Sequence, residues 1–175
     1  YFDVAVLGYG AKVSAAFTGA LAGQEIAAIS QVANNPARVE ERTRKMDDGL
    51  GGIIEHTVKF PIWFDPVADN GTPMCEALRQ AEALVRGWVG SHPDAFPPVV
   101  INITDGEATD GDPTVAAESL RNVTTTDGNV LLLNVHLSSH KGQQAARFPE
   151  TADDLTDQYA RQLFTMSSSL PPAMQ

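Results

Sequence analysis

The sequence predicts an α/β fold whose sheet is mostly parallel. Two apolar, β-branched runs of strand length occur at Val99–Thr104 and at residues 129–137. Helical periodicity precedes, separates and follows them, and glycine-rich acidic loops join the segments. Helices that alternate with buried strands are the pattern that builds a parallel sheet.

Length, charge and cysteine content limit the class of protein. The 175 residues suit a single domain over 1–175, with an expanded region at 18–70. The net charge of −10 argues against nucleic acid as a partner, since phosphate binding needs clustered lysine and arginine. The one cysteine, Cys75, excludes an internal disulfide and favours a reducing, cytoplasmic location. No apolar run approaches the roughly 18 residues of a membrane span, so none is expected.

The N-terminal part of the chain contains shorter elements. Residues 2–7 are apolar enough for a core strand, and residues 12–17 suit a second strand or a short helix. The charges of residues 38–45 alternate in sign, which predicts a solvated helix and not a basic patch. A flexible loop is expected at 47–52, and an edge or packed loop at the proline-flanked stretch 60–66.

The C-terminal part begins with a strong helix signal. Thr72 places a capping hydroxyl before Pro73, which suits the start of a helix that ends near residues 87–90. Its apolar face comprises Met74, Ala77, Leu78, Ala81, Leu84, Val85 and Trp88. Further helices are predicted at 113–123 and from 151 to about Met166.

An acidic, glycine-rich loop follows the strand Val99–Thr104. Ligands of open α/β sheets bind beyond the carboxyl ends of strands, where Asp105 lies. Helix starts and strand ends share one edge of a parallel sheet, so Thr72 can meet Asp105 there. A hydroxyl and a carboxylate are an oxygen pair suited to Mg²⁺, which keeps several waters. The later acids of the loop, which are Glu107, Asp110 and Asp112, are interpreted as solvated residues or helix caps.

These motifs resemble the von Willebrand factor A-type (VWA) domain, in the form found in bacterial proteins. The matching stretches are Gly71-Thr72-Pro73-Met74 and Val99-Val100-Ile101-Asn102-Ile103-Thr104-Asp105-Gly106. The resemblance implies a Rossmann-like, three-layer fold in which helices flank a mostly parallel central sheet. It also implies that Thr72 and Asp105 belong to a metal-ion-dependent adhesion site for Mg²⁺, with Ca²⁺ or Mn²⁺ as alternatives.

The chain departs from the family in one respect. The family's third ligand element, Asp-x-Ser-x-Ser, occurs nowhere in the 175 residues. In the family it follows the central first strand, which would lie upstream of Tyr1, and the last strand would lie after Gln175. We expect a segment of the same protein, or a separate one, to supply the missing strand. Metal binding by this chain alone is therefore expected to be weak or absent.

The resemblance implies a protein-binding module without catalytic residues. Mg²⁺ would bridge the site to an acidic side chain of a protein partner. One alternative is a metal-assisted phosphohydrolase that uses Asp105, although no nucleophile–base pair is evident. Another is a scaffold with a vestigial metal site. His136 and His140 are four residues apart but belong to a strand and a loop, so helical metal-ligand spacing does not apply.

Overall fold

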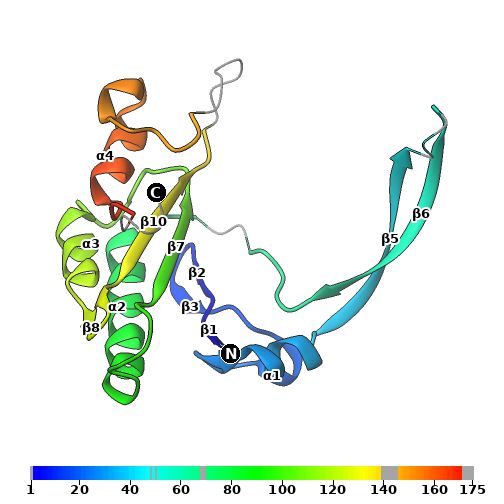
Figure 1. The fold of residues 1–175 in the computed structure, drawn as a ribbon, viewed down its shortest axis with the longest axis horizontal. Coiled ribbons are helices and arrows are strands. Elements are labelled where there is room, and N and C mark those ends of the chain that lie inside the picture. The colour runs from blue at the N-terminus through cyan, green and yellow to red at the C-terminus, as the bar shows by residue number, and fades with distance from the viewer. Residues whose placement is uncertain (1, 48, 50, 68–69, 139–145, 171–175) are drawn as a thin grey trace. The chain divides into compact units, whose positions relative to one another are not determined.

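The computed structural model describes residues 2–47, 49, 51–67, 70–138 and 146–170 (Figure 1). The fold is mixed α/β, as predicted from the sequence. The single, mostly parallel sheet that was expected is not found among the described residues, whose strands form five two-stranded sheets. The chain divides into two compact units. The N-terminal unit comprises residues 1–8 and 14–68, and the C-terminal unit comprises 9–13 and 69–175. In the part of the chain described, no helix has the length and apolar character needed to cross a membrane.

The C-terminal unit contains the elements predicted most firmly. Its helices and strands are α2 (Met74–Ser91), β7 (Val99–Thr104), α3 (Thr114–Arg121), β8 (Thr124–Thr125), β9 (Gly128–Asn129), β10 (Leu131–His136), the 3₁₀ helix η2 (Ala152–Asp154) and α4 (Gln158–Met166). The predictions of α2, β7, α3 and β10 are confirmed. The helix predicted from residue 151 is wrong in its first turns: Ala152–Asp154 form a separate 3₁₀ turn, and the Asp157 side chain caps α4 by accepting from the Ala160 N–H at 2.9 Å.

Strands β7 and β10 pair in parallel, from Leu131 opposite Val99 to His136 opposite Thr104. One face of the pair packs on α2, α3 and α4 (Figure 1). The core on this face comprises Met74, Leu78, Ala116, Ala117, Leu120, Val123, Val130, Leu132, Leu163 and Met166. Each helix contributes residues at helical spacing, which is why its amphipathic pattern could be recognised in the sequence.

The opposite face of β7 is open within the C-terminal unit. Val99, Ile101 and Ile103 are 47%, 60% and 56% exposed. Among the residues described, β10 is the one strand that pairs with β7. A parallel strand with apolar side chains on both faces is normally covered on both.

The N-terminal part of the chain contains β1 (Asp3–Val4), β2 (Leu7–Tyr9), β3 (Val13–Ala15), the 3₁₀ helix η1 (Gly19–Leu21), β4 (Ala27–Ala28), α1 (Ile29–Asn34), β5 (Arg38–Asp47) and β6 (Ile53–Ile62). Strand β1 pairs with β4, β2 with β3, and β5 with β6. The single strand predicted over 2–7 is wrong, because the chain leaves β1 after Val4 and pairs anew from Leu7. For residues 12–17, the strand alternative is confirmed as β3.

The solvated helix predicted over 38–45 is also wrong. These residues form most of β5, which pairs antiparallel with β6 over ten residue pairs. Residues 60–62, expected in an edge or loop, belong to β6. The alternating charges of β5 suit a two-residue period as well as a solvated helix, and pairing with β6 decides between them.

Candidate functional site

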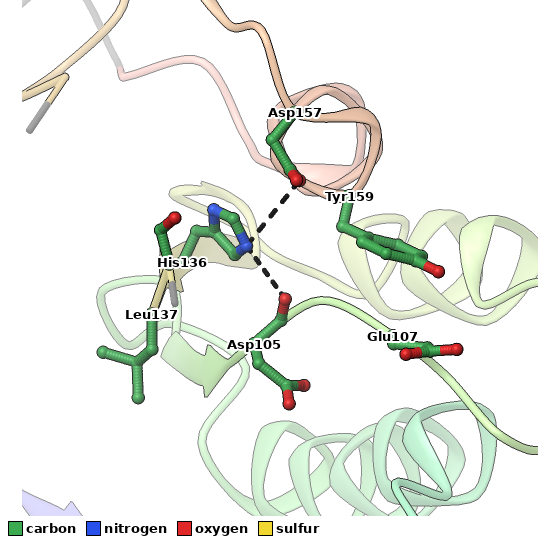
Figure 2. A pocket seen from close by; sticks show the side chains of 7 residues that line it. Asp105, Glu107, His136, Leu137, Asp157 and Tyr159 are labelled. Atoms are coloured by element: carbon green, nitrogen blue, oxygen red, sulfur yellow. Dashed lines mark hydrogen bonds and ion pairs between the residues drawn. The ribbon is translucent and has the colours of Figure 1, made fainter. Parts of the chain in front are cut away.

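Asp105 directly follows β7, where the sequence analysis placed it. Its backbone carbonyl accepts a hydrogen bond from Nε2 of His136 at 2.8 Å (Figure 2). The carboxylate points away from that ring, is exposed, and makes no hydrogen bond or ion pair with the residues described. The backbone of Asp105 is therefore held, while its carboxylate oxygens are available to a ligand.

Thr72 lies just before α2 and is tied to the loop after β7. Its N–H donates to Oγ1 of Thr109 at 2.9 Å, and its carbonyl accepts from the Thr109 N–H at 3.0 Å. Among the described residues its hydroxyl makes no hydrogen bond, and none joins Thr72 to Asp105. The structure thus brings the two loops together through Thr109, and both candidate side chains lack a partner among the residues described.

The predicted role of Thr72 as the helix cap is wrong. Pro73 occupies the N-cap position of α2, and neither residue caps the helix with a side chain. Instead Asp110 accepts from the N–H groups of Cys75, at 3.1 Å, and Glu76, at 2.9 Å. Burial raises the pKa of Asp110, but the N–H groups of Glu76 and Cys75 outweigh it and leave this pKa below its ordinary value. A loop residue from beyond β7 therefore caps α2 across the site.

Asp112 confirms the other cap predicted for this loop. Its Oδ1 accepts from the N–H and the hydroxyl of Thr114 at 3.0 and 2.6 Å, at the start of α3. Nε2 of Gln162, on α4, donates to the same oxygen at 3.0 Å. The hydrogen bonds from Thr114 lower the pKa of Asp112. Both Asp110 and Asp112 are thus occupied in holding helices.

A shallow hollow of about 140 Å³ lies beside Asp105 (Figure 2). It is lined by Asp105, Glu107, His136, Leu137, Ser138, Asp157 and Tyr159. Nε2 of His136 lies 3.8 Å from Oδ1 of Asp157. A Cβ atom at Gly106, whose φ is +97°, would stand 2.5 Å from Cβ of Tyr159. Close packing of α4 against this glycine brings Asp157 and Tyr159 to the site, and no local signal in the sequence reveals that contact.

A polar chain runs through the unit beneath the site. The hydroxyl of Tyr9 donates to Oδ1 of Asn102, Nδ2 of Asn102 donates to Oδ1 of Asn134 at 2.9 Å, and Nδ2 of Asn134 donates to the Leu163 carbonyl at 3.1 Å. Burial raises the pKa of Tyr9. None of these residues was predicted to belong to the site, although an asparagine inside each apolar run was a visible signal. They join β7, β10 and α4.

The Thr72 hydroxyl and the Asp105 carboxylate are oxygen donors of the kind that Mg²⁺ binds, and they would supply part of its ligands. The described residues contain no group of three or more His, Cys, Asp or Glu that could hold a metal ion. Thr72 and Asp105 offer two unpaired oxygens, and Mg²⁺ takes few protein ligands and several waters. His140 lies outside the described residues. Cys75, on α2, is buried, with 3% of its surface exposed.

Comparison of the chain with protein-family models, with curated proteins and with solved structures finds no match. The resemblance to the VWA domain therefore depends on the Thr72 and Asp105 motifs and on their order along the chain.

Proposed function

We propose that the C-terminal unit is a metal-dependent protein-binding module of the VWA type. One observation carries the proposal: the side-chain oxygens of Thr72 and Asp105, which have no partner among the residues described, occupy linked loops at the carboxyl end of a parallel strand. This is the edge at which α/β sheets bind ligands.

Each side chain has a distinct role in this proposal. The Thr72 hydroxyl binds Mg²⁺ directly or through a water, and the Asp105 carboxylate binds it through a water. A segment with the pattern Asp-x-Ser-x-Ser, outside these 175 residues, supplies further ligands. An acidic side chain of the protein partner completes the six positions, so that the bound metal selects a carboxylate.

The open side of β7 supports the three-layer, Rossmann-like arrangement that this proposal requires. The side chains of Val99, Ile101 and Ile103 are about half exposed, although their composition suits a buried strand. A further strand beside β7 and a helical layer over this face would bury them. The same strand would bring the Asp-x-Ser-x-Ser segment to the site.

Titration with Mn²⁺, followed by water proton relaxation, tests the site without a known partner. We expect weak binding by this chain, and a loss of at least about tenfold in affinity for Asp105→Ala and for Thr72→Ala. Asp127→Ala is the matched control, because this exposed carboxylate makes no hydrogen bond or ion pair with the residues described. Equal losses in all three variants would contradict the assignment to Thr72 and Asp105.

A metal-assisted phosphohydrolase is the second candidate. The hollow beside Asp105 favours it, since it gathers a histidine with three carboxylates. Against it, Nε2 of His136 is occupied by the Asp105 carbonyl. Turnover of p-nitrophenyl phosphate that needs Mg²⁺ and disappears in Asp105→Asn would favour the hydrolase. A third candidate is a scaffold with a vestigial site, and Mn²⁺ binding that is absent even when the Asp-x-Ser-x-Ser segment is supplied would favour it.

A further inference from the structure

The long ribbon of β5 and β6 is the least protected part of the structure. Its ten antiparallel pairs run from Arg38 opposite Ile62 to Asp47 opposite Ile53 (Figure 1). Most of its side chains are exposed, and Ile53, Ile54 and Phe60 are 73%, 52% and 44% exposed. An isolated two-stranded ribbon is at best marginally stable in water, and a third strand or a packed face is normally needed.

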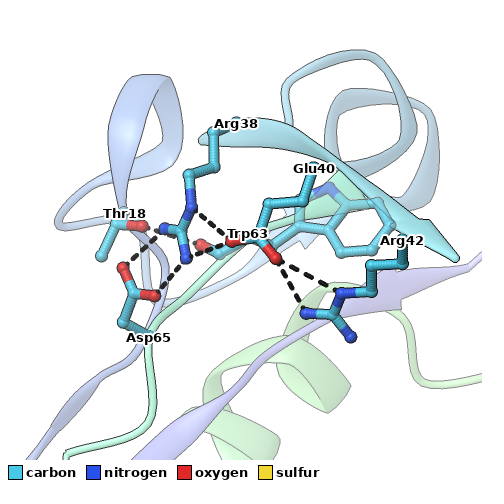
Figure 3. A network of polar contacts seen from close by, with 6 residues as sticks. All are labelled: Thr18, Arg38, Glu40, Arg42, Trp63 and Asp65. Carbon is cyan, nitrogen blue, oxygen red and sulfur yellow. Dashed lines mark hydrogen bonds and ion pairs between the residues drawn. The ribbon is translucent and has the colours of Figure 1, made fainter. Parts of the chain in front are cut away.

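Polar contacts hold the ribbon at its base (Figure 3). The guanidinium of Arg38 donates to both carboxylate oxygens of Asp65 at 2.8 and 2.7 Å, and its Nε donates to Glu40 at 2.8 Å. Arg42 donates to Glu40 at 3.0 Å and lies 3.9 Å above the ring of Phe60. These contacts all lie in the half of the ribbon nearest Ile62.

One edge of β6 is unpaired among the residues described, since β5 is its one partner there. A long, exposed edge with unpaired backbone N–H and C=O groups readily pairs with another strand. Two copies of β6 can pair antiparallel about a two-fold axis perpendicular to the sheet. This symmetry leaves each side chain on the same face of the sheet, and residues that face each other across the two strands must also share a face. The axis must therefore pass beside one residue, which faces its own copy.

The sequence of β6 is self-complementary about Thr57. A two-fold axis at this residue places Glu55 of each copy opposite Lys59 of the other, and Ile54 opposite Phe60. Each contact occurs twice. An axis at Glu55 or at Lys59 would instead set like charges against each other. Opposite charges and apolar groups that face each other across strands are stabilising, and like charges are destabilising.

The same register extends the pairing inside each ribbon. Lys45 faces Glu55 and Glu41 faces Lys59 within one copy. In the four-stranded sheet of the dimer, one row of facing side chains would contain Lys45, Glu55, Lys59 of the second copy and Glu41 of the second copy. The charges along this row alternate between positive and negative.

The edge of β5 offers no comparable arrangement. A two-fold axis at Glu41, Arg42 or Arg44 sets a charged residue against its own copy. An axis at Thr43 pairs Glu41 with Lys45, but it also sets Arg42 against Arg44. The occupant best suited to the free edge is therefore β6 of a second chain.

We propose that this protein forms a homodimer in which two β6 strands pair antiparallel about Thr57. The product is a continuous four-stranded sheet, β5–β6–β6–β5, whose central strands have no free edge. This interface uses residues of the N-terminal unit, and it is independent of Thr72, Asp105 and the metal.

Sedimentation of the whole chain over a range of concentrations tests the dimer. We expect a monomer–dimer equilibrium, weakened about tenfold by Glu55→Lys and by Lys59→Glu, since each variant places like charges at both symmetric contacts. An equimolar mixture of the two variants should associate again, because positions 55 and 59 then carry opposite charges at both contacts. A chain that stays monomeric throughout, or variants that are not restored by mixing, would overturn the proposal.

The mixture also separates dimer contacts from damage to the ribbon. Mixing does not change the pairs inside each ribbon, which are Lys45 with position 55 and Glu41 with position 59. A ribbon unfolded by its own substitution would therefore stay unfolded in the mixture. Lys45→Glu is the matched control: it alters the internal pair with Glu55 but leaves the free edge unchanged, and it should keep the dimer.

A cross-link tests the position of the axis. Thr57→Cys should form an intermolecular disulfide on oxidation, because residues opposite each other on antiparallel strands have Cα atoms about 4.5–5.5 Å apart. Thr43→Cys, its neighbour on β5, lies a strand further from the axis and should cross-link far more slowly. Equal rates for the two variants would contradict a two-fold axis at Thr57.

Discussion

Two pairs of strands in this protein are stabilised by different interactions. Strands β7 and β10 lie on a layer of helices, and Leu132 on β10 and Leu120 on α3 are fully buried. Strands β5 and β6 have no such layer in the described chain, and ion pairs at the base of their ribbon are exposed. The ribbon of β5 and β6 has ten residue pairs against six for β7 and β10, yet we expect the shorter pair to be the more stable. Burial of apolar side chains supplies the larger free energy, and exposed ion pairs supply little.

The largest difference should come from truncating a core residue. Leu120→Ala should lower the free energy of unfolding of the C-terminal unit by about 2–5 kcal/mol, since it removes buried methyl groups and leaves a cavity. Val39→Ala in the ribbon, where the side chain is 53% exposed, should cost less than about 1 kcal/mol. Urea unfolding followed by circular dichroism checks both. Equal costs would show that the ribbon buries Val39 against a further surface.

An intermediate effect is expected at the cap of α2. Asp110→Ala should cost about 1 kcal/mol near neutral pH, because it leaves the N–H groups of Cys75 and Glu76 without their acceptor. The folded-state pKa of Asp110 is lowered, so its contribution is complete above the unfolded pKa of about 3.9 and is lost as the pH falls through the folded value.

Unfolding of Asp110→Ala and of the original chain at a series of pH values measures this change. The two stabilities should converge in acid. Asp127→Ala, which removes a carboxylate that caps no helix of the same unit, is the control. A difference for Asp110→Ala that grows in acid would contradict the assigned direction of the pKa shift.

The smallest effect is expected at the base of the ribbon. Arg38→Ala removes the two hydrogen bonds to Asp65 and the one to Glu40. These side chains are about one third to one half exposed, so the surrounding water replaces most of the interaction. The effect of the substitution on thermal unfolding should be slight and should disappear in about 1 M salt. A large effect that persists in salt would show that this network is shielded from solvent. The difference in stability between the two strand pairs would then be smaller than we expect.

Elements with a clear apolar period were predictable from the sequence. Helix α2 begins after Thr72-Pro73, and its face from Met74 to Leu78 enters the core as predicted. The charged residues of β5 have no apolar period, so helix and strand remain close alternatives until β6 supplies partners. The position of Asp105 followed from the end of β7, whereas the cap at Asp110 depends on a contact between segments 34 positions apart.

The sequence by itself determined the order of the strong elements and the placement of Thr72 and Asp105 at loop positions. Local periodicity and strand ends are encoded by neighbouring residues, so they can be recognised without tertiary structure. Only the tertiary structure decided that Asp110 caps α2, that α4 packs closely against Gly106, and that residues 38–45 form a strand. Each of these depends on the partner that a segment meets, because hydrogen bonds and close packing join residues distant along the chain.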